Sequence, residues 1–115
     1  MFNLVKCKLP DNPLEFIQSC VRQGKVFWTY HVTMRLRGRF IARQAILQSY
    51  ESYEIIEGYP KGWYLPSYLV YSQYQGDIFH ILFAVDLEGG NVRIVTAHRP
   101  KPEEWTEGFR ARRDL

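Results

Sequence analysis

The chain has 115 residues, with 46% hydrophobic and 16% aromatic content and a formal net charge of +3. This length fits a single domain, 1–115, and the composition excludes a disordered chain. No apolar run reaches the roughly 20 residues of a membrane helix, and the first residues lack the apolar stretch of a signal peptide. We therefore expect a cytoplasmic protein without membrane contact. Cys7 and Cys20 form no CxxC metal half-site and are expected to be ordinary thiols.

The charges are segregated along the chain. Between Phe16 and Tyr50 there are six basic residues and no acidic one, whereas residues 51–91 hold six acidic residues and one basic residue. The last segment adds six basic residues against four acidic ones. If the first and last thirds meet in space, they form a basic face, which is typical of phosphate binding. A surface of ordinary solvated charges is the alternative interpretation.

Two helices are predicted in the first half of the chain. The sequence NPLE from Asn12 to Glu15 offers Asn at the N-cap, Pro at the first helical position and Glu at the third. Gly24 is expected to end this helix. Apolar residues recur at helical spacing within 14–21 and again within 42–51, which predicts the second helix.

The second half of the chain predicts strands. The four candidate segments are rich in β-branched and aromatic residues, with glycine-containing turns between them: 53–59, 67–74, 77–86 and 91–98. Short connections imply antiparallel neighbours. A last short helix is expected over 103–112, after two prolines. The sequence therefore predicts an α+β fold with two or three helices packed on one face of a four-stranded antiparallel meander sheet.

The stretch TYHVTMRLRGR, residues 29–39, has one histidine and three arginines but no acidic residue. As a strand, it would place all four of these side chains on one face, and its local alternation slightly favours this interpretation. As a helix, it would stack His31, Arg35 and Arg39 one turn apart. Only the helix would turn Arg37 to another side. In both interpretations His31, Arg35 and Arg39 share a face.

Several short motifs follow one another in a defined order. They are His31-x-x-x-Arg35-Leu36-x-x-Arg39, IIEGYP at 55–60, an apolar strand that carries His80, then Thr96, Pro100 and Trp105, and an arginine tail of Arg110, Arg112 and Arg113. Their order and spacing resemble the domain-of-unknown-function 4258 family over residues 29–113. Residues 1–28 would then be an N-terminal helical extension.

The resemblance implies a relation to RelE-type mRNA interferases, and with it an α+β domain and an antitoxin protein as partner. It also implies a helix over residues 29–39, and we adopt the helix for this reason. One position departs from the family pattern, because His98 stands where the family usually has tyrosine.

The residue types suit RNA cleavage without a metal. This reaction needs a base for the 2′-hydroxyl proton, cations for the extra phosphate charge and an acid for the leaving oxygen. Histidine serves either proton role near neutral pH, and arginine binds phosphate bidentately. We expect His31, His98 and Arg35 to be catalytic, with a purely structural role as the alternative for His31. The residues expected to bind nucleic acid are Arg35, Arg39, Arg99, Arg110, Arg112 and Arg113.

The position of His98 relative to His80 depends on the turn between their strands. A three-residue turn, 88–90, would pair the two histidines on one face, and a two-residue turn, 89–90, would put them on opposite faces. We expect His80 to be a half-buried structural histidine. The three histidines lack close ligand spacing, so we expect no metal and no cofactor.

The leading hypothesis is a toxin-like, RNA-acting protein, a candidate metal-independent endoribonuclease of a toxin–antitoxin pair. Its partners would be RNA, including ribosome-bound mRNA, and the antitoxin. The alternatives are a non-catalytic nucleic-acid-binding module and a protein-interaction domain that uses the acidic middle segment. Tyr68, Tyr71 and Tyr74 could stack on bases, but we expect them to pack in the sheet.

Overall fold

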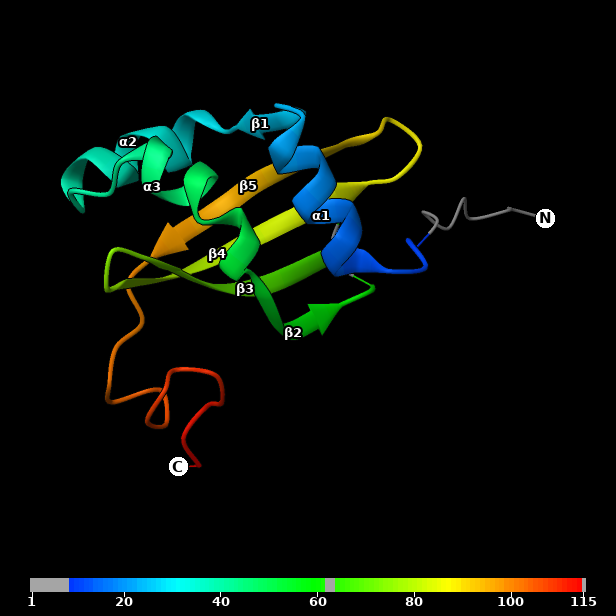
Figure 1. Ribbon diagram of the computed structural model, residues 1–115. Coiled ribbons are helices and arrows are strands. Elements are labelled where there is room, and N and C mark those ends of the chain that lie inside the picture. Colours follow the sequence, from blue (N-terminus) through cyan, green and yellow to red (C-terminus); the bar gives the residue numbers. More distant parts are fainter. Residues whose placement is uncertain (1–8, 62–63, 115) are drawn as a thin grey trace.

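The computed structural model of the chain describes residues 9–61 and 64–114 (Figure 1). Its elements, in chain order, are α1 (Pro13–Arg22), β1 (Val26–Trp28), α2 (Tyr30–Gly38), α3 (Arg43–Gln48), the 3-10 helix η1 (Tyr50–Ser52), β2 (Glu54–Tyr59), β3 (Ser67–Tyr74), β4 (Asp77–Asp86) and β5 (Asn91–His98). The α+β class is confirmed. No helix in the described part of the chain is long and apolar enough to span a bilayer.

The sheet has five strands in the order β1-β5-β4-β3-β2. Strands β2 to β5 form the predicted antiparallel meander, but β1 adds a parallel edge strand, with Val26 opposite Val92 and Trp28 opposite Ile94. The prediction of a four-stranded, purely antiparallel sheet is therefore wrong in this detail. Three residues are too few to show alternation, and the partner of β1 lies far away in sequence.

Helix α1 begins and ends as its sequence predicts. The Asn12 side chain accepts a hydrogen bond from the Glu15 amide at 3.1 Å, and Gly24, past the last turn, has φ +75°. Ile17 and Val21 are buried in the core beneath the helix. Helix α1 and strand β1, which lie largely ahead of the family-like segment, thus pack into the same core as the rest of the chain.

Residues 30–38 form a helix, as the family resemblance implies, and not the strand that local alternation favours. Thr29 caps it, because its hydroxyl oxygen accepts a hydrogen bond from the Val32 amide at 3.1 Å. Val32 and Leu36, one turn apart, are buried against the sheet. Burial of this pair outweighs the polar–apolar alternation of the segment.

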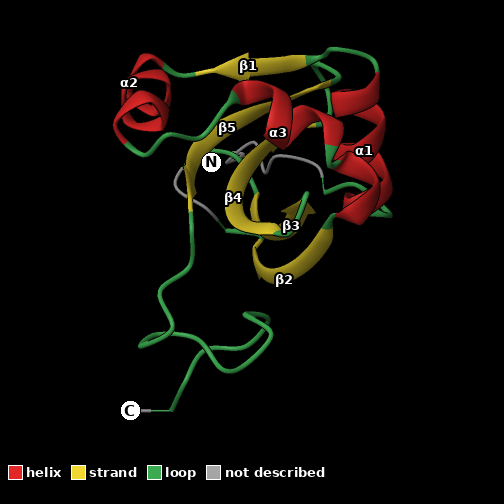
Figure 2. Ribbon diagram, turned by 60° about the vertical axis from the view of Figure 1, so that its left-hand side comes forward, coloured by secondary structure: helices red, strands yellow, loops and turns green. Residues whose placement is uncertain are grey.

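The helices cover one face of the sheet, and the C-terminal segment, residues 99–114, lies on the other side (Figures 1 and 2). The helix predicted over 103–112 is absent. Turns and an isolated bridge between Trp105 and Arg112 take its place, and Gly108 and Phe109 have the positive φ values of 88° and 59° that no continuous α-helix allows. Trp105 is buried against the sheet with 2% of its surface exposed.

Two smaller expectations are also settled in the described part. Tyr68 and Tyr71 are buried and Tyr74 is half-buried, so these tyrosines pack in the fold as predicted. Cys20 is a buried free thiol, whereas Cys7 lies outside the described residues.

Candidate functional site

A groove of about 320 Å³ runs between α2 and the end of β5. It is lined by His31, Val32, Arg35 and Arg39 from α2 and by Val95, Thr96 and His98 from β5. The short edge strand creates it, because β1 stops opposite Ile94 and leaves the following residues of β5 without a strand neighbour on that side. The predicted common face of His31, Arg35 and Arg39 is therefore one wall of a groove, and His98 joins it from the sheet.

The two groove arginines differ in how they are held. Arg39 is half-buried, and its guanidinium donates to the carbonyl oxygen of Ala97 at 2.7 Å. Arg35 is exposed. Within residues 9–61 and 64–114, neither guanidinium has a carboxylate at ion-pair distance. Their charge thus remains available to an anion. Arg37 is exposed and does not line the groove, as the helix predicted.

A bulge in β5 brings His98 to this position. Asp86 pairs with Asn91, so the turn spans the four residues 87–90, and neither of the two predicted turns occurs. With that turn alone, His80 would oppose Ala97. Val95 is an extra residue in the ladder, and it restores the pairing of His80 with His98. The two histidines therefore share a face, as the three-residue turn predicted, for a different structural reason.

His98 has the surroundings of a proton acceptor. It is half-buried, and burial lowers the pKa of its imidazole below the usual value of 6.5. The positive charge of Arg39 lowers this pKa further, and the carboxylate of Glu104 acts in the opposite direction. The net shift is downward, so the ring is neutral at neutral pH and has a nitrogen lone pair that can take a proton.

His80 does not reach the groove. Its side chain is fully buried, more than the half-buried position expected from the sequence. Its Nε2 is 2.8 Å from the carbonyl oxygen of Phe109, and the edge of the ring meets Trp105 with centroids 4.3 Å apart. Burial lowers the pKa of this imidazole. His80 therefore holds the C-terminal segment on the sheet.

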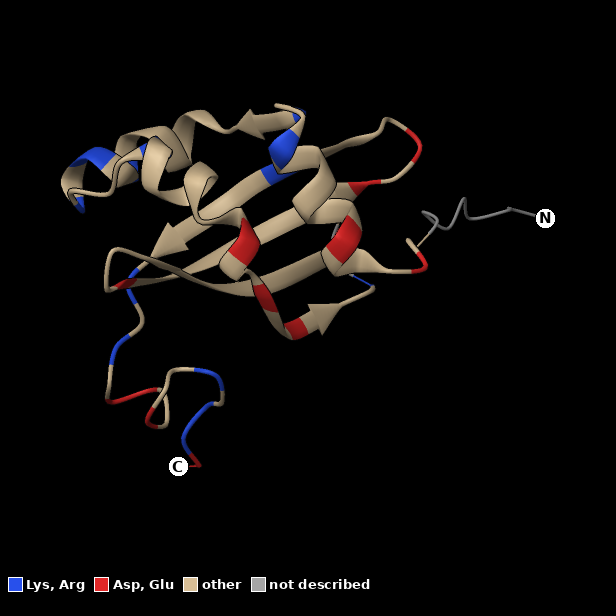
Figure 3. Cartoon of the chain, viewed as in Figure 1, with Lys and Arg blue, Asp and Glu red and all other residues tan. Residues whose placement is uncertain are grey.

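The remaining predicted arginines have partners within the fold. Arg99 makes a bidentate ion pair with Asp77, at 3.0 and 2.8 Å, and it also donates to the carbonyl oxygen of Arg39 at 2.7 Å. It lies beside the groove but is held by these contacts. Figure 3 shows the basic positions of α2 and of the C-terminal segment, with acidic positions on β2.

The tail arginines hold the C-terminal segment in place. Arg110 pairs with Glu54 at 2.8 Å and Arg112 with Glu57 at 2.7 Å, and both carboxylates belong to β2. Arg113 donates to the carbonyl oxygen of Pro102 at 2.6 Å. The basic face expected from both ends of the chain is thus centred on α2, because acidic residues of the middle segment offset the tail.

Sequence reasoning missed Glu104. This exposed carboxylate residue lines a hollow next to the groove, together with Arg39, His98, Arg99 and Lys101. No hydrogen bond or ion pair joins this carboxylate to another described residue. No local sequence pattern indicated that Glu104 lies near His98, because the segment that contains Glu104 was expected to form a helix.

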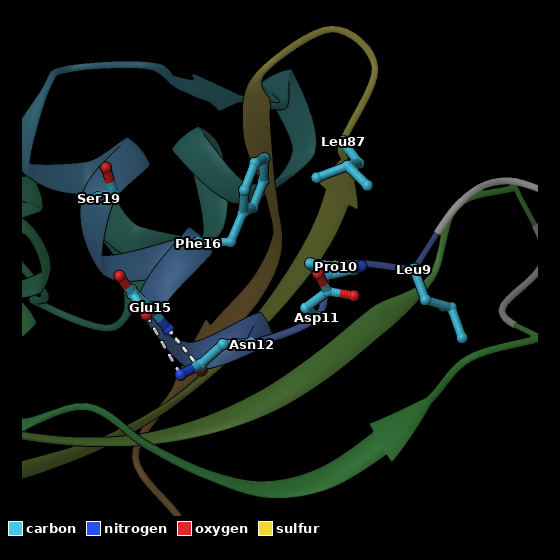
Figure 4. A pocket seen from close by; sticks show the side chains of 8 residues that line it. All are labelled: Leu9, Pro10, Asp11, Asn12, Glu15, Phe16, Ser19 and Leu87. Carbon is cyan, nitrogen blue, oxygen red and sulfur yellow. Dashed lines mark hydrogen bonds between the residues drawn. The ribbon is translucent and has the colours of Figure 1, made fainter.

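A further hollow lies at the start of α1 (Figure 4). Its polar lining includes Asp11, Asn12 and Glu15, and Asn12 and Glu15 hydrogen-bond to each other there. Of the described residues that line it, the charged ones are acidic and none is basic or a histidine, which does not favour a polyanion. Among the described residues, no three His, Cys, Asp or Glu side chains are close enough to hold a metal ion together.

A family model described as "Domain of unknown function (DUF4258)" matches residues 28–99, more than half of the chain. The matched segment begins at the end of β1 and closes just after His98, so it includes both walls of the groove. No curated protein and no solved structure matches the chain.

Proposed function

Since the chain belongs to the DUF4258 family, a domain family of unknown function, we propose its function from the groove itself. The protein acts on RNA as a toxin-like, metal-independent endoribonuclease. The observation that carries this proposal is that one groove is lined by His31, Arg35 and Arg39 from α2 and by His98 from β5, and that neither of these arginines has an ion-pair partner among the described residues.

Each side chain suits one part of the reaction. Arg35 and Arg39 bind the non-bridging oxygens of a phosphodiester and stabilise the additional charge of the transition state. His98, neutral at pH 7, takes the proton of the 2′-hydroxyl while the 2′-oxygen attacks phosphorus. The bond from phosphorus to the 5′-oxygen breaks, and His31 protonates this oxygen. The products are a 2′,3′-cyclic phosphate and a free 5′-hydroxyl.

A protein partner fits a different surface. Phe27 on the edge strand β1 is 59% exposed, and Tyr30 and Met34, one turn apart on α2, are 80% and 47% exposed. These apolar side chains lie on elements adjacent to the groove. Such an exposed apolar surface supports a relation to RelE-type toxins, because an antitoxin in the cytoplasm would bind there and cover the site. RNA, including ribosome-bound mRNA, would compete with the antitoxin for the site.

One observation favours a second function, a non-catalytic nucleic-acid-binding module. His31 is exposed, and no hydrogen bond from another described residue orients its ring. Catalytic histidines are usually held by such a partner. In this alternative Arg35 and Arg39 bind phosphate, and the two histidines only shape the groove.

The two functions are separated by incubating the purified protein with labelled single-stranded RNA in the presence of EDTA. The enzyme produces fragments with 2′,3′-cyclic phosphate and 5′-hydroxyl ends, and chelation leaves its rate unchanged. RNA binding without cleavage of free or ribosome-bound message would identify the binding module. Absence of RNA binding would exclude both and leave a protein-interaction domain.

A further inference from the structure

A cavity of about 520 Å³ lies on the helix-free face of the sheet, beside the groove. Its floor is formed by Leu69, Leu82 and Thr96, which are direct neighbours across β3, β4 and β5. Tyr59 and Trp105 are among its walls. We propose that this cavity binds a nucleobase of the RNA strand whose phosphate lies in the groove, and that it prefers guanine. This inference rests on the proposed function and specifies its substrate.

His98 connects the two sites. Its side chain lines the cavity and also the groove that contains Arg35 and Arg39. Because one imidazole borders both, a phosphate bound by the arginines places a base of an adjoining nucleotide at the mouth of the cavity. Lys61 adds a basic side chain to the lining of this cavity, and Arg112, which also lines it, is paired with Glu57.

The cavity walls suit a flat heterocycle. Two leucine side chains offer apolar contact for one face of a ring. Tyr59, which is 42% exposed, provides an accessible aromatic ring at the rim. Its hydroxyl donates to Glu57, and Glu57 is paired with Arg112, so this ring is held in place before a ligand arrives. Stacking of bases on such aromatic side chains is a general mode of single-strand recognition.

Glu104 determines which base fits. Glu104 lines the cavity, and its carboxylate has no hydrogen-bond or ion-pair partner among the described residues, although Lys61 and Arg112 line the same cavity. A carboxylate only accepts hydrogen bonds, and its two oxygens match two adjacent N–H donors. Guanine presents this pair on its Watson–Crick edge as N1–H and N2–H. Adenine, cytosine and uracil each place an acceptor beside their donor, which the carboxylate would repel.

Equilibrium binding to RNA that cannot be cleaved tests the inference. The probes are fluorescent 2′-O-methyl hexamers of alternating U-G, U-A and U-C sequence and an all-U hexamer, measured by anisotropy. Wild-type protein should bind the U-G hexamer at least about fivefold more tightly than the other three, as expected for one bidentate base contact. Glu104→Gln should remove this preference. The matched control Glu103→Gln, which changes an exposed carboxylate outside the cavity, should keep it.

A second variant separates the cavity from the carboxylate. Leu82→Phe fills the floor and should lower affinity for the U-G hexamer to that of the all-U hexamer, with all-U binding unchanged. Equal binding of all four hexamers by the wild type would overturn the inference and leave the proposed function intact. If no hexamer binds even at low salt, the proposed function fails, and the inference fails with it.

Discussion

His80 and His98 lie opposite each other on β4 and β5, with their ring centroids 6.0 Å apart, yet their surroundings differ. His80 is enclosed beneath Trp105, whereas His98 borders the groove and the neighbouring cavity. Burial lowers the pKa of both imidazoles. On this face of the sheet, His80 therefore has a structural role, whereas His98 is accessible to a ligand.

The first prediction concerns stability against pH. Both imidazoles are less basic in the folded chain than the usual value of about 6.5, so folding favours their neutral forms. Their contribution is complete above this pH and is lost as the pH falls through 6.5 towards the lower folded pKa values. We expect the free energy of unfolding, from urea titrations, to decrease between pH 7 and pH 5.

In His80→Leu this decrease should be smaller, because one of the two linked protons is gone. The lowered pKa values of Glu57 and Asp77 remove stability only at lower pH, below the usual carboxylate values of 4.5 and 3.8, so the two windows are separable. An unchanged slope in His80→Leu would show that burial of this histidine is not linked to folding.

The second prediction concerns the C-terminal segment. Trp105 covers His80, and the guanidinium of Arg112 lies over the indole at 4.6 Å from its centroid. Trp105→Ala should cost about 3 kcal/mol, the lower end of the range for buried tryptophan. The loss should be local. In the variant, the backbone amides of residues 101–114 should exchange hydrogen faster, and the exchange rates in β4 should change little. Unchanged exchange rates over 101–114 would argue against this anchoring role.

These two predictions depend on tertiary contacts that could not be predicted from the sequence. The cap of α1 and the four antiparallel strands follow from local residue order, and they were predictable. Helix α2 was expected only from the family resemblance, because local alternation favours a strand there. The parallel strand β1 depends on pairing with residues 66 positions away, as for Val26 and Val92. The register of His98 depends on a bulge at Val95 that has no sequence signature of its own.

The same limit applies to the site. The common face of His31, Arg35 and Arg39 follows from helical spacing. Two other features depend on tertiary contacts. Acidic side chains of β2 form ion pairs with Arg110 and Arg112, and Glu104 lies near His98. From the sequence alone, every arginine of the tail was equally expected to contact phosphate, because the order of charges along a chain does not tell which charges meet in space.

The third prediction concerns Phe40, which follows α2 with φ 55° and is 89% exposed. A non-glycine residue in this left-handed conformation is strained, and the exposed ring contributes little packing. Phe40→Gly should stabilise the protein by about 0.5–1 kcal/mol. Phe40→Ala keeps the Cβ and should gain less. Thermal melting of both variants measures the difference, and a destabilised glycine variant would contradict it.

The fourth prediction concerns RNA binding through the groove. Each phosphate contact on a single strand contributes about 0.7 to the slope of log affinity against log salt concentration. Arg35→Ala should weaken binding and reduce this slope by about that amount. Arg37→Ala is the matched control, since Arg37 lies two residues away on the same helix but outside the groove. Equal effects of both variants would indicate general charge attraction without a defined site.

The central claim is that His98 and His31 act together on RNA held by Arg35 and Arg39. Single-turnover cleavage, measured alongside RNA affinity for wild type, His98→Ala, His31→Ala and Arg37→Ala, tests it most directly. Loss of a proton-transfer group should lower the cleavage rate by about 10²- to 10⁴-fold in each histidine variant and leave affinity nearly unchanged. The arginine control should cleave like the wild type. Histidine variants that cleave RNA at the wild-type rate would contradict this account.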